Sequence, residues 1–184
     1  PLDMQFIFTA NPEDYTNRGS IVTPLKDRIG SQILTHYPET IQIAKTITSQ
    51  EASLDTRQSS TIFIPELAKD ILEQIVFEAR KSEFVDVKSG VSARLSITAF
   101  ENLVSTAERR LLHSGDDKTG IRMSDFTGII PAITGKIELV YEGEQEGAYN
   151  VALTLLGNAI KSLYSEFFPK IEKIEKQGVE TPYD

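Results

Sequence analysis

The sequence predicts a mainly helical protein in which a short strand-containing segment precedes a bundle of helices. Residues 4–9 contain the apolar run Phe6-Ile7-Phe8, which is typical of a strand buried on both faces of a parallel sheet. Residues 31–37 also have strand character, and five or six helical patterns follow them. Two parallel strands bury little by themselves, so we expect Phe6 and Phe8 to pack against further strands or another chain.

Polar residues mark the turns between the two predicted strands. Pro12 disfavours helical dihedral angles for Asn11, so we expect Asn11 to end the first strand in an extended conformation. Its amide then leaves the edge of the sheet at which open α/β sheets bind ligands. Pro24 can begin a short helix over residues 25–29, and Arg28 lies at the end of this turn.

Two helical patterns follow the second predicted strand. The first begins at Pro38-Glu39 and continues to about Gln50, whereas residues 51–61 are rich in Ser, Thr and charge and predict a loop. The second begins near Pro65, a residue that the first turn of a helix tolerates. Its apolar residues recur at helical spacing, namely Leu67, Ile71, Leu72, Ile75, Val76 and Ala79.

A long helix is predicted over residues 93–113, and its start is ambiguous. If Ser92 caps it, Arg94 lies in the first turn, where the helix dipole disfavours a cation by up to about 1 kcal/mol. A nearby anionic ligand would remove this conflict. If the helix begins at Thr98 instead, which also satisfies the capping-box pattern, Arg94 is a loop residue and the dipole argument does not apply.

Three further segments complete the chain. A short helix is predicted to begin at Ser124-Asp125 and to be interrupted by Pro131. Residues 142–147 combine Glu with Gly and predict an exposed linker. The last predicted helix covers about residues 149–176, and Pro169 should kink or end it near its preceding residue.

Three short segments carry the most specific pattern in the chain. They are T-A-N-P-E-D at 9–14, P-L-K-D-R-I-G at 24–30 and G-V-S-A-R-L-S at 90–96. In their order and spacing they resemble the sensor 1, arginine-finger and sensor 2 motifs of AAA+ ATPases, in the branch that holds the MoxR-like ATPases and the ATPase subunit of magnesium chelatase.

The resemblance implies an architecture and an activity. Residues 1–38 would be the C-terminal end of a RecA-like α/β nucleotide-binding core, residues 39–140 a helical lid, and residues 141–184 a linker and C-terminal helix. The complete protein would use ATP and Mg²⁺ and would hydrolyse ATP in a ring, for which a hexamer is expected. Members of this branch remodel a partner or assist metal insertion, often with a partner that carries a von Willebrand type A domain.

Asn11 would be the catalytic amide of the sensor 1 segment. ATP hydrolysis needs an in-line water and stabilisation of charge on the γ-phosphoryl oxygens. A neutral amide at the end of a strand can orient that water or contact the γ-phosphate without adding a competing charge. The alternative is that Asn11 only caps a turn before Pro12.

Arg28 would be the arginine finger that reaches the γ-phosphate bound by a neighbouring subunit, where Lys is a poor substitute because it lacks the planar fork. The alternative is a surface Arg paired with Asp27 or Glu39. Arg18 is a second candidate for the same interface. The resemblance assigns Arg94 to the phosphates bound by its own subunit, with lid movement following the nucleotide state.

Composition narrows the classes of function. The net charge of −8 and the scattered basic residues argue against non-specific nucleic-acid binding, and no apolar stretch is long enough to span a membrane. The absence of Cys excludes disulfides and is typical of a cytoplasmic protein. His36 and His113 lack the spacing of zinc ligands, so no metal site is predicted.

One missing motif limits what this chain is expected to do alone. It contains no G-x-x-x-x-G-K-[ST] phosphate loop and no strand that ends in paired acidic residues for Mg²⁺. We expect both to precede Pro1 in a longer protein, so this segment alone should be inactive. Two alternatives stay open: a non-catalytic helical adaptor that binds a protein partner, and an AAA+ subunit that assembles without hydrolysing ATP.

Overall fold

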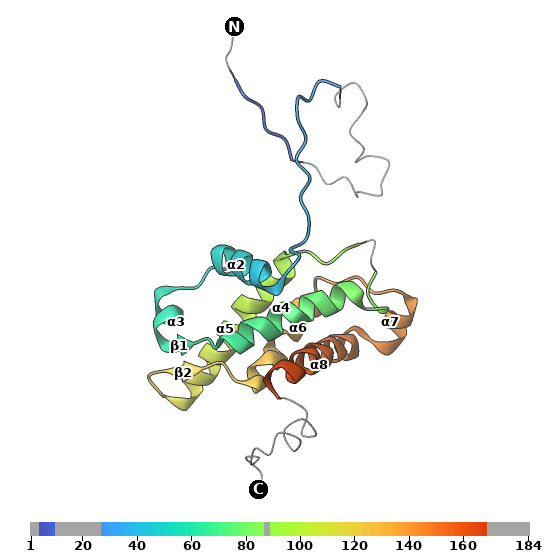
Figure 1. The fold of residues 1–184 in the computed structure, drawn as a ribbon. Coiled ribbons are helices and arrows are strands. Elements are labelled where there is room, and N and C mark those ends of the chain that lie inside the picture. The colour runs from blue at the N-terminus through green and yellow to red at the C-terminus, as the bar shows by residue number, and fades with distance from the viewer. Residues whose placement is uncertain (1–3, 10–26, 87–88, 169–184) are drawn as a thin grey trace, which may run out of the picture. The chain divides into compact units, whose positions relative to one another are not determined.

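The structure is a computed structural model that describes residues 4–9, 27–86 and 89–168 (Figure 1). The chain divides into two compact units, Pro1–His36 and Tyr37–Asp184. Within the described residues of the first unit there is no helix or strand, whereas the second unit is built almost entirely from helices. The prediction of a mainly helical protein is therefore confirmed.

The two predicted strands are wrong. Residues 4–9 and 31–37 have no regular secondary structure, and the Phe6 and Phe8 side chains are 67% and 70% exposed. Their rings stack on each other, with centroids 6.2 Å apart. A strand needs neighbours for its backbone hydrogen bonds, and the described residues of this unit supply none. The predicted helix over residues 25–29 is also not found, since Asp27 and Arg28 form a turn and residues 25–26 lie outside the described part.

The second unit contains eight α-helical or 3-10 elements and two very short strands in its described part. In chain order they are α2 Ile41–Glu51, α3 Thr56–Thr61, β1 Ile62–Phe63, α4 Glu66–Lys81, α5 Arg94–Ser114, β2 Thr119–Gly120, the 3-10 helix η1 Met123–Ile129, α6 Ile130–Thr134, α7 Tyr141–Glu146 and α8 Ala148–Phe167. The two strands pair in parallel, Ile62 with Thr119 and Phe63 with Gly120. No helix in the described part is long and apolar enough to cross a membrane.

The amphipathic patterns predicted the long helices well. Pro65 precedes the first turn of α4, and Arg80 and Lys81 lie in its last turn, where positive charge suits the helix dipole. Helix α5 ends at Gly115, whose φ of 74° needs a residue without a side chain. Helix α8 ends at Phe167, as Pro169 predicted, and residues 170–176 of the predicted helix lie outside the described part.

Two short helices occupy segments that composition assigned to a loop and a linker. Within residues 51–61, α3 begins with a capping box in which the Asp55 side chain accepts from the Gln58 backbone N–H at 2.7 Å and Gln58 Oε1 accepts from the Asp55 N–H at 3.2 Å. Residues 142–147 mostly belong to α7, in which Gly143 packs against the backbone of Phe84. Local capping and tertiary packing therefore outweighed polar composition.

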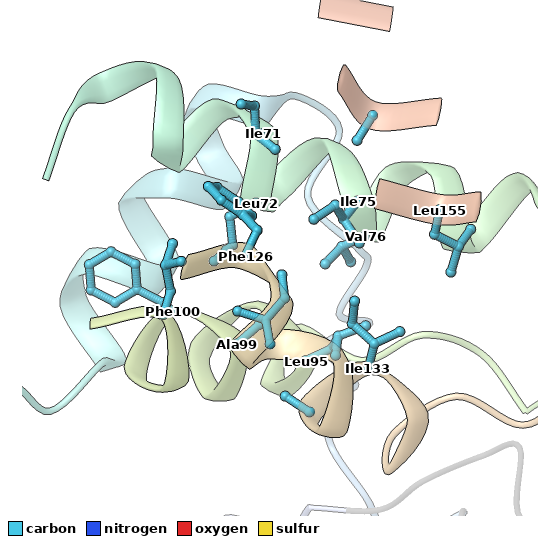
Figure 2. Packing of buried hydrophobic residues seen from close by; sticks show 14 of the residues in the cluster. Ile71, Leu72, Ile75, Val76, Leu95, Ala99, Phe100, Phe126, Ile133 and Leu155 are labelled. Atoms are coloured by element: carbon cyan, nitrogen blue, oxygen red, sulfur yellow. The ribbon is translucent and has the colours of Figure 1, made fainter. Parts of the chain in front are cut away.

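The core lies where α4, α5, η1, α6 and α8 meet (Figure 2). Figure 2 shows side chains from α4 and α5 converging with Phe126 of η1, Ile133 of α6 and Leu155 of α8. The largest apolar side chains with almost no exposure are Leu72, Ile75, Val76, Leu95, Leu103, Val104, Phe126, Ile129, Ile133, Val151 and Leu155. Burial of this apolar surface is the main force that holds the helices together.

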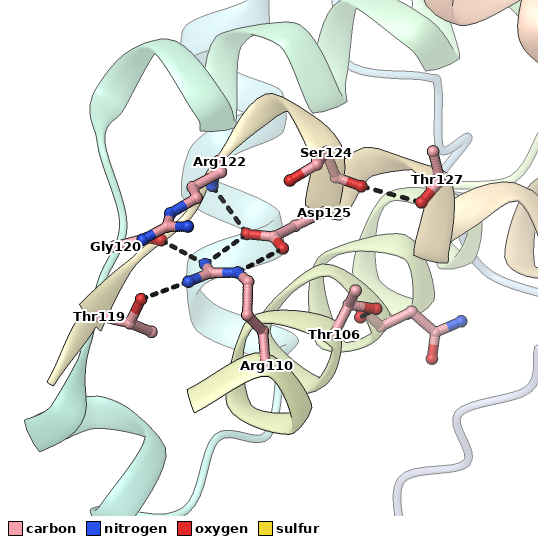
Figure 3. Close-up of polar contacts among 9 residues, drawn as sticks. Thr106, Arg110, Thr119, Gly120, Arg122, Ser124, Asp125 and Thr127 are labelled. Carbon is pink, nitrogen blue, oxygen red and sulfur yellow. Dashed lines mark hydrogen bonds and ion pairs between the residues drawn. The ribbon is translucent and has the colours of Figure 1, made fainter. Parts of the chain in front are cut away.

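A polar network joins α5 to β2 and η1 (Figure 3). The Arg110 guanidinium donates to both Asp125 carboxylate oxygens at 3.1 and 2.8 Å, to Thr119 Oγ1 at 2.6 Å and to the Gly120 carbonyl at 2.7 Å. Burial acts to raise the pKa of Asp125, but the hydrogen bonds from Arg110 and from the Arg122 backbone N–H lower it overall. The bidentate geometry orders the turn between α5 and η1.

Leu103→Ala tests the core. Leu103 is fully buried, so its truncation leaves a cavity and should lower the free energy of unfolding by about 2–5 kcal/mol. Leu112→Ala is the matched control on the same helix, because Leu112 is 58% exposed and its truncation should cost about 0.5 kcal/mol or less. Urea denaturation measures both values. Similar losses in the two variants would contradict the described packing of α5.

Candidate functional site

The structure describes two of the three predicted site residues. Asn11 lies outside the described residues, as does Arg18. Arg28 is exposed in a turn of the first unit. Arg94 is exposed and is the first residue of α5 in the second unit. The site is therefore built here around Arg94, whose surroundings are described.

The start of α5 presents Arg94 as an uncompensated cation. Helix α5 begins at Arg94 and not at Thr98, but its N-cap residue is Ala93 and not Ser92. Ser92 Oγ accepts a hydrogen bond from the Arg94 backbone N–H at 3.1 Å. The first turn of α5 contains no acidic residue. Among the described residues the Arg94 guanidinium has no hydrogen-bond or ion-pair partner. Because the helix dipole disfavours a cation at this end, an anion bound by Arg94 would relieve a local conflict.

Helix α4 holds the start of α5 in place through two charged side chains, Glu73 and Arg80. They lie seven residues apart, two turns along the same face of α4. The Glu73 carboxylate accepts a hydrogen bond from Ser96 Oγ at 2.7 Å. Arg80 donates from Nε and Nη2 to the Val91 carbonyl, both at 3.2 Å. The two anchored residues, Val91 and Ser96, flank Arg94 in the chain.

Glu73 also ties α2 to this arrangement. Thr48 Oγ1 of α2 donates to the second carboxylate oxygen of Glu73 at 2.5 Å, and the Glu73 residue is only 1% exposed. Burial raises the pKa of Glu73, although the hydrogen bonds from Thr48 and Ser96 act in the opposite direction. The carboxyl group therefore links α2, α4 and α5 at a cost of desolvation that its two hydroxyl partners offset in part.

Aromatic rings cover the Arg80 guanidinium. Its central carbon lies 4.3 Å from the centroid of the Tyr37 ring and 5.5 Å from that of Phe77, which is cation–π geometry. Burial lowers the pKa of Arg80, and the influence of Tyr37 and Glu73 opposes this shift. Gly90 has a φ of 69°, and a side chain at this position would overlap the Tyr37 hydroxyl. Tyr37 therefore packs against both Arg80 and the loop that leads into α5.

A separate shallow cleft lies between α2, α3, β1, α4 and α5. Its volume is about 450 Å³, and apolar side chains such as Leu54, Phe63 and Phe100 line much of it. Its charged lining residue, Lys69, is already ion-paired with Glu66 at 2.6 Å. In the part of the chain that the structure describes, no cluster of three His, Cys, Asp or Glu side chains could hold a metal ion. We therefore take the surroundings of Arg94, and not this cleft, as the candidate site.

Sequence reasoning missed Glu73, Arg80 and Tyr37. One signal was available for Glu73, because it follows Ile71 and Leu72 at the edge of the apolar face of its helix. A carboxylate in that position has to find hydrogen-bond partners when the face is buried. The contacts of Arg80 and Tyr37 depend on how the segments pack, which no local pattern reveals.

Comparisons with known proteins do not assign the chain. No protein-family model, no curated protein and no solved structure matches it. The resemblance of segments 9–14, 24–30 and 90–96 to AAA+ motifs stays a prediction that rests on those residues. The environment of Arg94 is an independent observation on the third segment.

Glu73→Gln tests the buried carboxyl group. Gln keeps the shape of Glu and can accept one hydroxyl hydrogen bond, but it does not titrate. Because the folded state raises the pKa of Glu73, it binds the proton more tightly than the unfolded chain does. The free energy of unfolding contributed by this group is therefore present at low pH and is lost as the pH rises from the ordinary pKa of Glu through the raised pKa.

The measurement is urea denaturation of the wild-type and Glu73→Gln proteins across this pH range. The stability of the wild-type protein minus that of the variant should fall as the pH rises and should be flat below the ordinary pKa of Glu. Asp125 titrates in both proteins, so its effect cancels in the difference. A difference that does not change with pH, or that rises, would overturn this account of Glu73.

Proposed function

We propose that this chain is the C-terminal part of an AAA+ ATPase subunit that resembles the MoxR-like and magnesium chelatase branch. In this proposal residues 1–38 are the C-terminal end of a RecA-like nucleotide-binding core, although residues 4–9 and 31–37 form no strand here, and the helical second unit is the lid. The observation that carries it is Arg94: an exposed guanidinium at the first residue of α5, without a described partner, on a helix start that α4 braces at Val91 and Ser96.

Arg94, Asn11 and Arg28 each have a separate role in the proposed hydrolysis of ATP. Arg94 binds the phosphates of the ATP held by its own subunit and so couples the lid to the nucleotide state. Asn11 orients the attacking water, and Arg28 stabilises the negative charge on the γ-phosphate of the neighbouring subunit. Mg²⁺, when bound, neutralises charge on the β- and γ-phosphates, and its ligands are expected outside this chain.

A shared site requires an assembly. Arg28 and Arg94 would contact nucleotides in different subunits, so the proposed active form is a ring, with a hexamer expected. Lid movement in such a ring would remodel a partner protein or assist metal insertion, and a protein with a von Willebrand type A domain is the expected partner.

Arg94→Ala in the complete protein tests the lid contact. Loss of a charge-assisted hydrogen bond to phosphate costs about 1.5–3 kcal/mol, so the Kd for ATP should rise roughly 10- to 100-fold. Arg109→Ala is the matched control, since Arg109 is an exposed arginine near the other end of α5. Calorimetric titration with a non-hydrolysable ATP analogue gives the two Kd values. Unchanged affinity in Arg94→Ala would refute this role.

Arg28→Ala in the complete protein tests the contact between subunits. Hydrolysis should fall by about 10³- to 10⁵-fold while the Kd for ATP stays close to that of the wild-type protein. Arg28→Lys should not restore the rate, because an ammonium group cannot contact two phosphate oxygens with a planar fork. Steady-state turnover and nucleotide binding are measured on the same preparations. Weakened binding with normal turnover would count against an arginine finger.

One observation favours a second candidate function, the helical adaptor. Helix α8 buries one apolar face but exposes Tyr149, Leu153, Tyr164 and Phe167 along an adjacent stripe. The Tyr164 ring also stacks on that of Phe168, with centroids 4.6 Å apart. An adaptor would use such a stripe to bind an apolar helix of a partner protein without nucleotide. Turnover of ATP by the complete protein would favour the ATPase over the adaptor. Binding of ATP without turnover would indicate a subunit that assembles without hydrolysis.

A further inference from the structure

We propose that Arg80 is a positioning residue for Arg94, and that the Tyr37 ring helps to hold Arg80 in place. The inference rests on the proposed function, because it concerns how the residue of the same phosphate contact is positioned. Its basis is that one guanidinium touches both the connection that enters α5 and Tyr37, the first residue of the second unit.

Arg80 determines where the backbone lies just before Arg94. The connection between α4 and α5 has no helix or strand at residues 89–92. Its ends are held by other groups, since Ser89 Oγ donates to the Glu138 carboxylate and the Ser92 carbonyl accepts from the Leu95 N–H at 2.9 Å. Arg80 holds the Val91 carbonyl between them. Both Nε and Nη2 of Arg80 donate to the Val91 carbonyl, which fixes this peptide in direction as well as in position. Val91 is 2% exposed, so its side chain anchors the same point in the core. Arg94 follows three residues later.

Tyr37 determines how firmly Arg80 is held. Its ring lies against the guanidinium at 4.3 Å, and its hydroxyl lies close to Gly90. The Tyr37 residue is 49% exposed and is not one of the buried core residues, so its replacement should leave the core intact. Loss of the ring would expose Arg80 to water and loosen its hold on the Val91 carbonyl. The orientation of Arg94 would then change.

The side-chain hydrogen bonds of Arg80 in the described part of the chain go to the Val91 carbonyl. It forms no ion pair there, and its guanidinium lies over two aromatic rings. Lys81, the next residue, lies in the same last turn of α4 and is exposed. Both side chains suit the helix dipole equally at this end. Lys81→Ala therefore provides a control, because it removes a positive charge from the same helix turn without removing a contact with Val91.

The experiment uses the complete protein and a double-mutant cycle. Arg80→Ala should lower kcat/KM for ATP by about 10²-fold through misplacement of Arg94. In an Arg94→Ala background the same change should have almost no further effect, because the residue through which Arg80 acts is gone. Lys81→Ala should leave kcat/KM unchanged, and Arg80→Lys, which keeps the cation on Tyr37, should restore part of the loss. Tyr37→Leu should resemble a weaker Arg80→Ala.

A second measurement does not depend on ATP turnover. Hydrogen exchange of the peptide that covers residues 89–96 should be faster in Arg80→Ala and Tyr37→Leu than in the wild-type protein, and unchanged in Lys81→Ala. If the wild-type protein does not hydrolyse ATP, the proposed function fails, and exchange alone decides whether Arg80 fixes this segment. Unchanged exchange overturns the inference. So does an equal loss of kcat/KM in the wild-type and Arg94→Ala backgrounds, because that result means a general structural role.

Discussion

The arrangement of the second unit depends on how a buried carboxyl group is satisfied. Glu73 lies on the helix that packs against most of the core, and its two oxygens are taken by Thr48 of α2 and Ser96 of α5. Moving a polar group from water into an apolar environment without a hydrogen-bond partner costs several kcal/mol. The helices cannot slide or rotate independently without breaking one of these hydrogen bonds. Apolar packing supplies the stability of the bundle, whereas Glu73 restricts it to one relative arrangement of the three helices.

The sequence predicted those helices that are specified by the spacing of their own apolar residues. Helices α4, α5 and α8 show apolar residues every three or four positions, and these residues form the core as expected. The predicted interruption at Pro131 is not where the structure has it, because the 3-10 helix passes into α6 at Ile130 and Pro131 lies in the first turn of α6. The strands at residues 4–9 and 31–37 failed because pairing partners decide whether an apolar run becomes a strand. The predicted loop at 51–61 failed because the Asp55 capping box outweighs a polar composition.

In the candidate site, too, local features could be predicted from the sequence and tertiary contacts could not. The position of Arg94 in the first turn of α5 could be predicted from the local pattern around Ser92, although Ala93 and not Ser92 is the N-cap residue. The groups that brace it could not. Arg80 meets Val91 from eleven residues away, Glu73 meets Ser96 from another helix, and Tyr37 arrives from the beginning of the unit. Such cross-helix contacts require the packing itself to be known, and the AAA+ resemblance concerns only the residues proposed to face nucleotide.

The placement of Tyr37 has a practical consequence for dividing the protein. A boundary drawn at the helical pattern of α2 would start a separately expressed helical unit at about Glu39 and discard the tyrosine ring that covers Arg80. Such a fragment would retain its hydrophobic core and could pass a test of helical content by circular dichroism. The Arg80 guanidinium, which holds the entry into α5, would nevertheless lack the ring that covers it. A fragment for such work should begin a few residues before Tyr37.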